Sequence, residues 1–409
     1  MDEKVLKNYA KLIVRKGVNV QKDQEVIISA NVKDEYFVKY VVEEAYGAGA
    51  KRVRVDWSSD VLSRLQYQYE DKEVLSEVLS YEEAKWQRET EVLPAKIHIT
   101  SDDPDSLSGI DSDKLSYVSG NRSKIRLKYL EKMDNKYQWT IIGIPGKAWA
   151  KKVFPNLSDE EAIEKLWEAI IKVTRITDDP IKAWDIHNKY LDDKKNILNK
   201  LKIKKLWYKA SNGTDFYIEL HKNVKFEAAE EKTLGGVPYN PNMPTEECFT
   251  SPKWRKAEGV VYASKPLSVF GNVVNDFGFR FQNGRVVEVI AKDIKTKEVL
   301  EKLISIDKGA AQLGEIAFVP FDSPINQTGL MFYETLFDEN ACCHLALGRA
   351  FTECIENYQN LSEEEINAVN LNKSSIHVDF MIGTSDLSIV GETFDGEIVE
   401  IFKDGVYAI

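Results

Sequence analysis

Two residues of the chain, His377 and Asp379, have the types and the spacing expected of metal ligands. They lie two positions apart in a segment that also contains Ile376, Val378 and Phe380. Alternate side chains of a β-strand point to opposite faces, so the two polar residues would share one face and the apolar residues the other. Imidazole nitrogen and carboxylate oxygen together suit a divalent cation. A polar pair on the solvent side of an edge strand is the alternative interpretation.

A second histidine, His344, follows a carboxylate at Glu339. The sequence predicts a helix near His344, on which Gly348 and Phe351 share a face with it, four and seven residues further on. On one continuous helix Glu339 and His344 would point about 140° apart, so they converge only if Glu339 lies in the turn before the helix. A core histidine with satisfied hydrogen bonds is the alternative role for His344.

Glu315 and the pair Glu246-Glu247 complete the candidate set. Glu315 interrupts an apolar, strand-like segment, and a buried carboxylate needs a cation, a proton or an arginine. A structural salt bridge is the alternative there, and an exposed acidic turn is the alternative for Glu246 and Glu247. Two histidines and several carboxylates in one half of a chain are typical of a two-metal hydrolytic site, with the ions roughly 3.5–4 Å apart.

Other catalytic signatures are absent from the sequence. It contains no Gly-x-Ser-x-Gly elbow, no Walker A loop, no Cys-x-x-Cys pair and no His-Glu-x-x-His motif. The segment Gly47-Ala48-Gly49 follows a predicted helix instead of a strand, so it is no dinucleotide fingerprint. A metal site is therefore the strongest candidate for chemistry.

The composition disfavours several classes of protein. The chain has 409 residues, 43% of them hydrophobic, which is enough for two globular domains and argues against extensive disorder. Its 55 Lys+Arg against 66 Asp+Glu give a net charge of −11, which makes nucleic acid and anionic membranes poor partners. No apolar stretch approaches the ~18 residues of a membrane span, and the N-terminus does not resemble a signal peptide. Four cysteines make no disulfide framework, so a reduced, cytoplasmic protein is expected.

Residues 1–200 are expected to form an α/β domain with a mostly parallel open sheet. Apolar segments at residues 26–29, 52–56, 96–100 and 138–142 predict strands, and helical patterns separate them. The first two strands and the helix between them form a β-α-β unit, which requires a parallel pair. Ser158 and Glu161 predict a capping box at the start of a later helix.

Residues 201–409 are expected to form a β-rich α+β domain that carries the catalytic site. Two pairs of strand-like segments enclose turn sequences and predict hairpins: residues 203–208 with 215–220, and residues 277–281 with 286–290 around Asn283-Gly284. One helix is predicted before Asp307 and another after Asp338.

Five segments resemble motifs of the M29 family, the thermophilic-type metalloaminopeptidases. They occur in the family's order and at similar spacing, and the resemblance covers nearly the whole chain. Their combination is specific to this family. The segments are residues 242–252, 313–315, 335–341, 344–348 and 377–383.

The resemblance implies a cytosolic homodimer that removes N-terminal residues from peptides with a free N-terminus, through attack by water activated on two divalent metal ions. By position, the implied ligands are Glu247, Glu315, Glu339, His344, His377 and Asp379. Glu315 is the candidate bridge between the metals. Glu246 is the candidate general base, and which of Glu246 and Glu247 is the ligand stays open. Histidine with carboxylates suits zinc, cobalt or manganese, and carboxylates alone tolerate magnesium.

Phe351 departs from the family pattern, which has a tyrosine seven residues after the position of His344. A phenol there can donate to the oxyanion of a tetrahedral intermediate or touch a metal, whereas a phenyl ring cannot. A non-catalytic or weakly active metal- and peptide-binding homodimer is therefore one alternative function, and another two-metal amidase or dipeptidase is a second. Cys248, Cys342 and Cys343 also depart from the pattern, either as buried inert thiols or as soft ligands.

Overall fold

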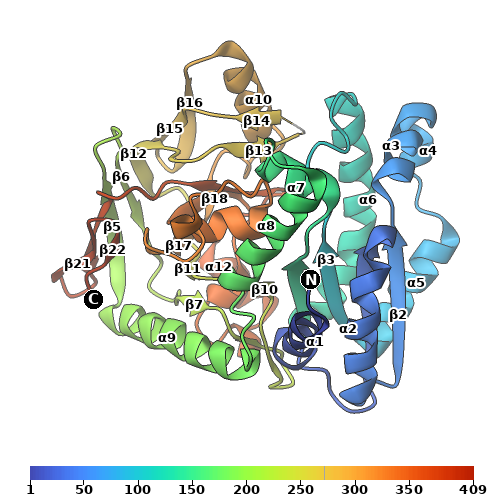
Figure 1. Ribbon diagram of the computed structural model, residues 1–409. Helices are drawn as coiled ribbons and strands as arrows, with labels where there is room; N and C mark the ends of the chain where they lie inside the picture. Colours follow the sequence, from blue (N-terminus) through green and yellow to red (C-terminus); the bar gives the residue numbers. More distant parts are fainter. Residues whose placement is uncertain (271) are drawn as a thin grey trace. The chain divides into compact units, whose positions relative to one another are not determined.

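A computed structural model describes residues 1–270 and 272–409 of the chain (Figure 1). These residues form two compact units, neither of which is continuous in sequence. Unit 1 contains Met1–His187, Glu230–Thr245 and Met331–Leu336. Unit 2 contains Asn188–Ala229, Glu246–Leu330 and Phe337–Ile409. The division into folding domains at residue 200 stays a prediction. The compact units differ from it, because residues 188–200 belong to unit 2 and two later segments belong to unit 1.

Unit 1 is built on a parallel sheet with the strand order β10-β4-β3-β1-β2. The four predicted strands and their parallel pairing are confirmed. A short strand from much later in the chain, β10, extends the sheet beyond β4. The strands are β1 (Glu25–Asn31), β2 (Arg52–Ser58), β3 (Ala95–Thr100), β4 (Trp139–Gly143) and β10 (Asn242–Met243).

Helices alternate with these strands, as the sequence predicts for an α/β fold (Figure 1). The predicted capping box starts α8, where the Ser158 hydroxyl accepts from the Glu161 N–H and the Glu161 carboxylate accepts from the Ser158 N–H. Within the described residues, no helix is both long and apolar enough to cross a membrane. The helices are α1 (Glu3–Leu12), α2 (Glu35–Gly47), α3 (Asp60–Tyr69), α4 (Lys72–Ser76), α5 (Ser80–Val92), α6 (Ser112–Met133), α7 (Lys147–Val153) and α8 (Asp159–Val173). The next helix, α9 (Pro180–Leu201), carries the chain into unit 2.

Among its described residues, unit 2 contains two large antiparallel sheets and a two-stranded one, in which β13 (Leu267–Val269) pairs with β14 (Asn272–Val274). The eight-stranded sheet has the order β16-β15-β12-β6-β5-β20-β21-β22, and both predicted hairpins, β5–β6 and β15–β16, lie in it. Its strands are β5 (Ile203–Lys209), β6 (Asp215–Glu219), β12 (Ala257–Tyr262), β15 (Phe277–Gln282), β16 (Arg285–Ala291), β20 (Ser388–Thr393), β21 (Ile398–Lys403) and β22 (Val406–Tyr407). The predicted helix before Asp307 is α10 (Ile294–Ile304).

The five-stranded sheet has the order β19-β18-β17-β11-β7 and shares a core with the eight-stranded sheet. Phe380 on β19 packs edge-on against Phe279 on β15, with ring centroids 5.1 Å apart. Phe318 on β17 packs against Phe402 on β21 at 5.5 Å. One face of the five-stranded sheet therefore lies against the core, and the other is available for polar residues. Its strands are β7 (Glu227–Ala228), β11 (Cys248–Thr250), β17 (Leu313–Phe318), β18 (His344–Gly348) and β19 (His377–Met381).

Candidate metal centre

His344 lies on a strand, so the predicted helix at this position is wrong. It is the first residue of β18, every residue of which is buried. The sequence His-Leu-Ala-Leu-Gly favours a helix locally, but β18 is paired on both sides, with β17 and β19, and this tertiary pairing decides its conformation. Phe351 consequently follows a strand and does not share a helical face with His344.

Three neighbouring strands bring the ligand candidates to one face of the five-stranded sheet. Glu315 on β17 lies opposite Ala346 on β18, and Ala346 lies opposite Asp379 on β19. His377 lies opposite Gly348 in the same ladder. Directly opposed residues of antiparallel strands project from the same face. The small residues of β18 therefore leave room in which the longer side chains of β17 and β19 can meet.

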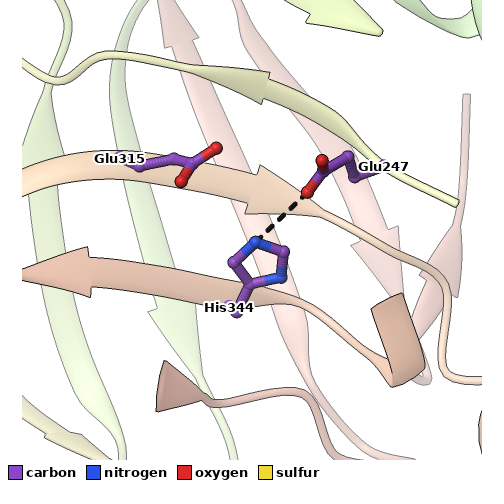
Figure 2. Close-up of side chains that lie close together, drawn as sticks. All are labelled: Glu247, Glu315 and His344. Carbon is purple, nitrogen blue, oxygen red and sulfur yellow. Dashed lines mark ion pairs between the residues drawn. The ribbon is translucent and has the colours of Figure 1, made fainter. Parts of the chain in front are cut away.

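Glu247, Glu315 and His344 form the first group of potential ligands (Figure 2). One ligand atom from each lies within 4.8 Å of the others, and His344 Nε2 is 3.2 Å from Glu247 Oε2. Glu247 directly precedes β11, so it comes from the strand next to β17. Both Glu246 and Glu247 are buried, which excludes the exposed acidic turn.

Glu315, His377 and Asp379 form a second group, also with ligand atoms within 4.8 Å of one another. His377 Nε2 is 3.0 Å from Glu315 Oε2 and 3.4 Å from Asp379 Oδ1. His377 Nδ1 lies 2.7 Å from the carbonyl oxygen of Arg349 and donates to it. That hydrogen bond fixes the ring, so Nε2 is the nitrogen that faces the carboxylates. Glu315 belongs to both groups.

The charge of this cluster calls for cations. Burial raises the pKa of Glu315 to about 7, and the charges of Asp379 and Glu247 add to the effect while His377 opposes it. Burial would lower the pKa of His377, but the nearby carboxylates of Asp379 and Glu315 outweigh this effect and raise that pKa to about 11. Asp379 Oδ1 is buried and accepts no hydrogen bond from the described residues. A buried carboxylate oxygen without a donor is costly unless a cation satisfies it, so the donor set fits divalent metal ions.

Glu339 and Glu246 are close to the cluster in sequence but belong to neither group of three. Glu339 starts the 3₁₀ turn Glu339–Ala341, which precedes β18. Glu339 therefore lies in a turn before His344, as the convergence of these two side chains requires. Its pKa is raised by burial first, and then by the charges of Asp379 and Glu247, which places it in the same electrostatic environment. The structure thus joins five of the six predicted ligands in two groups and leaves Glu339 beside them.

Phe351 lies against the cluster although the helical argument for it fails. Its ring centroid is 4.7 Å from that of His377 and 5.6 Å from that of Phe249. A ligand candidate is therefore covered on one side by an apolar ring. Cys248, Cys342 and Cys343 are buried free thiols and belong to neither ligand group. Burial raises the pKa of Cys248 to about 12, as is usual for an inert thiol.

Sequence reasoning missed two contributors to this arrangement. Gly348 has a φ of 108°, and a Cβ there would lie 2.1 Å from the Ile376 carbonyl oxygen, so only glycine fits beside the segment that leads to His377. Asn340 is fully buried and accepts a hydrogen bond from the Glu246 N–H. Gly348 can be recognised in the sequence as the end of an apolar segment. No local sequence pattern indicates the role of Asn340.

Comparisons with known proteins identify the family of this chain. A family model described as thermophilic metalloprotease (M29) matches residues 2–407. Aminopeptidase AmpS of Bacillus subtilis (strain 168) is 40% identical over 405 residues, covering 98% of each chain. Aminopeptidase PepS of Streptococcus thermophilus is 39% identical over 407 residues, covering 99% of this chain and 98% of that protein. The structure of wild-type AmpT from Thermus thermophilus matches with a TM-score of 0.91 and 35% identity, covering 100% of both chains. The chain therefore belongs to the M29 family of thermophilic metalloproteases.

Proposed function

We propose that this protein is a metalloaminopeptidase that uses two divalent ions to hydrolyse the first peptide bond of peptides with a free N-terminus. The family and the aminopeptidase names of the relatives support the reaction. The observation that carries the two-ion centre is the position of Glu315, which is common to both groups of ligand atoms. A carboxylate shared between two sets of ligands is suited to bridge two metals.

The residues divide into two sets around Glu315. Glu247 and His344 would hold one ion, and His377 and Asp379 would hold the other. Glu339 is the remaining candidate ligand, supported by its place next to the carboxylates that raise its pKa. Zinc, cobalt and manganese suit this mixture of imidazole and carboxylate, with magnesium as the less suited choice.

Divalent ions bound here would lower the pKa of a coordinated water and polarise a carbonyl oxygen. Glu246, which is buried beside Glu247 and outside both ligand groups, is the proposed base that accepts the water proton and delivers it to the leaving amine. The hydrogen bond to the Arg349 carbonyl keeps the His377 ring oriented during turnover. The surrounding carboxylates would attract the ammonium group of a peptide N-terminus, and a requirement for a free amine is expected for this reason.

A cytoplasmic homodimer is the proposed state of the protein. The free, buried thiols suit a reducing compartment, and the family resemblance supports the dimer. The net charge of −11 supports the expectation that neither nucleic acid nor an anionic membrane is a partner.

Release of free amino acids from peptides tests the function. Leu-, Arg- and Phe-initiated peptides, each also with an N-acetyl group, would be incubated with chelator-treated protein and with zinc, cobalt, manganese or magnesium restored. The proposal expects hydrolysis that requires both a metal and a free amine, and two metal ions per chain by elemental analysis. Equal cleavage of acetylated peptides would favour another two-metal amidase instead.

A second candidate function is a metal- and peptide-binding homodimer with little or no turnover. Phe351 favours it, because the ring that lies against His377 has no hydroxyl to donate to an oxyanion. The presence of every candidate ligand favours the active enzyme. Folded, dimeric protein that binds metal and peptide but hydrolyses none of the peptides would establish this alternative.

A further inference from the structure

Asn340 connects the segment that carries Glu246 with the segment that carries Glu339. It is fully buried in the 3₁₀ turn Glu339–Ala341. Its Oδ1 accepts a hydrogen bond from the Glu246 backbone N–H at 2.7 Å, and its Nδ2 donates to Glu339 Oε1 at 3.4 Å. A single amide therefore contacts the backbone of the candidate base and the carboxylate of a candidate ligand.

The Glu246 N–H determines which way this amide points. An N–H group needs an acceptor, so the Asn340 oxygen must face Glu246 and the NH₂ group must face the opposite way, toward Glu339. Glu339 thus receives a neutral donor. Such a donor supports the ionised carboxylate without adding a positive charge that would compete with a metal ion.

The turn that carries Asn340 is itself held in place. The Ser323 hydroxyl, which is buried, donates to the Ala341 carbonyl oxygen at 2.8 Å. Ser323 is in turn fixed by a hydrogen bond from its N–H to the Pro320 carbonyl oxygen. Because the turn is anchored at Ala341, next to Asn340, the amide is held in place when it contacts Glu246 and Glu339.

We propose that Asn340 is a positioning residue of the metal centre, which sets the separation between the Glu246–Glu247 backbone and the Glu339 carboxylate. The proposal rests on the metal centre of the proposed function, but it does not require that the substrate be a peptide. Groups that orient metal ligands from the second layer typically change metal affinity 10–100-fold when they are removed.

Asn340→Ala tests the proposal, and Asn199→Ala is its matched control. Asn199 also accepts from a backbone N–H, that of Phe226, at 2.7 Å, and it donates to the Phe226 carbonyl oxygen at 2.9 Å. It lies in α9 and contacts none of the candidate ligands through these bonds. Each variant loses one hydrogen bond accepted from a backbone N–H and one donated bond, but only Asn340→Ala loses them beside the candidate ligands.

Calorimetric titration of chelator-stripped protein with zinc and manganese is the first measurement. Asn340→Ala is expected to weaken metal affinity roughly 10–100-fold, and at saturating metal to lower kcat more than it raises KM. Asn199→Ala should lower the thermal midpoint and leave affinity and kcat within about twofold of the original protein.

Unchanged metal affinity in folded Asn340→Ala protein would overturn the proposal. If that variant does not fold, Asn340→Ser carries the same expectation, because its shorter side chain can reach at most one of the two partners. Circular dichroism and the thermal midpoint of the stripped proteins establish folding. Original protein that binds no metal would remove the proposed function itself, so the two failures are distinguishable.

Discussion

Glu315 and Asp379 stand on different strands and face each other across one alanine. Both residues lie directly opposite Ala346, Glu315 on β17 and Asp379 on β19. Adjacent strands are roughly 4.8 Å apart, so the two carboxylates must reach over the alanine methyl group to approach each other. They do so closely enough for both to belong to a group of ligand atoms within 4.8 Å. The second ligand group therefore depends on a small side chain at position 346.

Ala346→Val is expected to disrupt this group selectively. Two additional methyl groups would lie between Glu315 and Asp379 in a fully buried position, where overpacking costs about 1–3 kcal/mol. We expect loss of about one metal ion per chain and a fall in kcat/KM of at least roughly tenfold, measured by elemental analysis and peptide hydrolysis. The same substitution at half-buried Ala291 on β16 is the control. Full metal content in Ala346→Val would show that the methyl-sized gap is not required.

Glu315→Gln removes the carboxylate common to both ligand groups while keeping its size. We expect both ions to bind more weakly, because an amide oxygen carries no charge to bridge two cations, and kcat/KM to fall by roughly 10²–10³. Metal content after gel filtration measures the first effect. Glu288→Gln is the control, since Glu288 forms an exposed ion pair with Arg280. Retention of both metals and full activity in Glu315→Gln would refute the bridging assignment.

Phe351→Tyr tests whether the missing phenol limits the rate. The ring lies 4.7 Å from the His377 ring, so a hydroxyl on it is expected to provide a donor near the reacting carbonyl. One oxyanion donor is worth roughly 10²–10³ in kcat, which sets the upper limit of the expected increase. Steady-state kinetics on a Leu-initiated peptide measure it, and metal affinity should stay unchanged. An unchanged kcat would mean that another group already donates to the oxyanion.

The stability of the protein should fall in mild acid because of His187. Burial first, and then the charge of Arg175, lower the pKa of His187 to about 3, whereas in the unfolded chain it returns to about 6.5. At a pH between these two pKa values, His187 is protonated in the unfolded chain and neutral in the folded protein. The free energy of unfolding therefore decreases as pH falls from about 6.5, by up to roughly 1.4 kcal/mol per pH unit from this residue.

His187→Gln isolates this contribution. His187 Nε2 donates to the Thr245 carbonyl oxygen at 2.7 Å, and a glutamine amide can donate in the same way without taking up a proton. Urea unfolding of chelator-stripped protein from neutral pH to about pH 5 should show a shallower pH dependence for the variant. His221→Gln, at a half-buried histidine, should retain most of the slope. Equal slopes for His187→Gln and the original protein would contradict the prediction.

The features that the sequence predicted well are those determined by neighbouring residues. Alternation over residues 376–380 placed His377 and Asp379 on one face of a strand, and the structure confirms that placement. Asn283-Gly284 marked the β15–β16 hairpin because the turn itself requires positive φ, here 51° and 72°. The order of strands and helices in the first half followed from short segments in the same way.

The features that the sequence did not predict depend on contacts between residues far apart in the chain. The local sequence predicts a helix at His344, whereas its strand conformation depends on pairing with β17 and β19, which come from other parts of the chain. The Asn340–Glu246 hydrogen bond joins residues 94 positions apart, and no local sequence pattern predicts it. The motif resemblance supplied the candidate ligands where periodicity was insufficient, but the grouping of five of them around Glu315 came from the strand register.

The short strand β10 has a consequence for synthesis of the protein on the ribosome. β4 is complete at Gly143, but its partner on that side, β10, is translated only roughly a hundred residues later. Until then β4 is an open edge, which is the part of a nascent sheet most prone to pair with another chain. A fragment that ends near residue 200 would keep this edge permanently, so an excised N-terminal half should be designed with residues 238–245 fused back onto it.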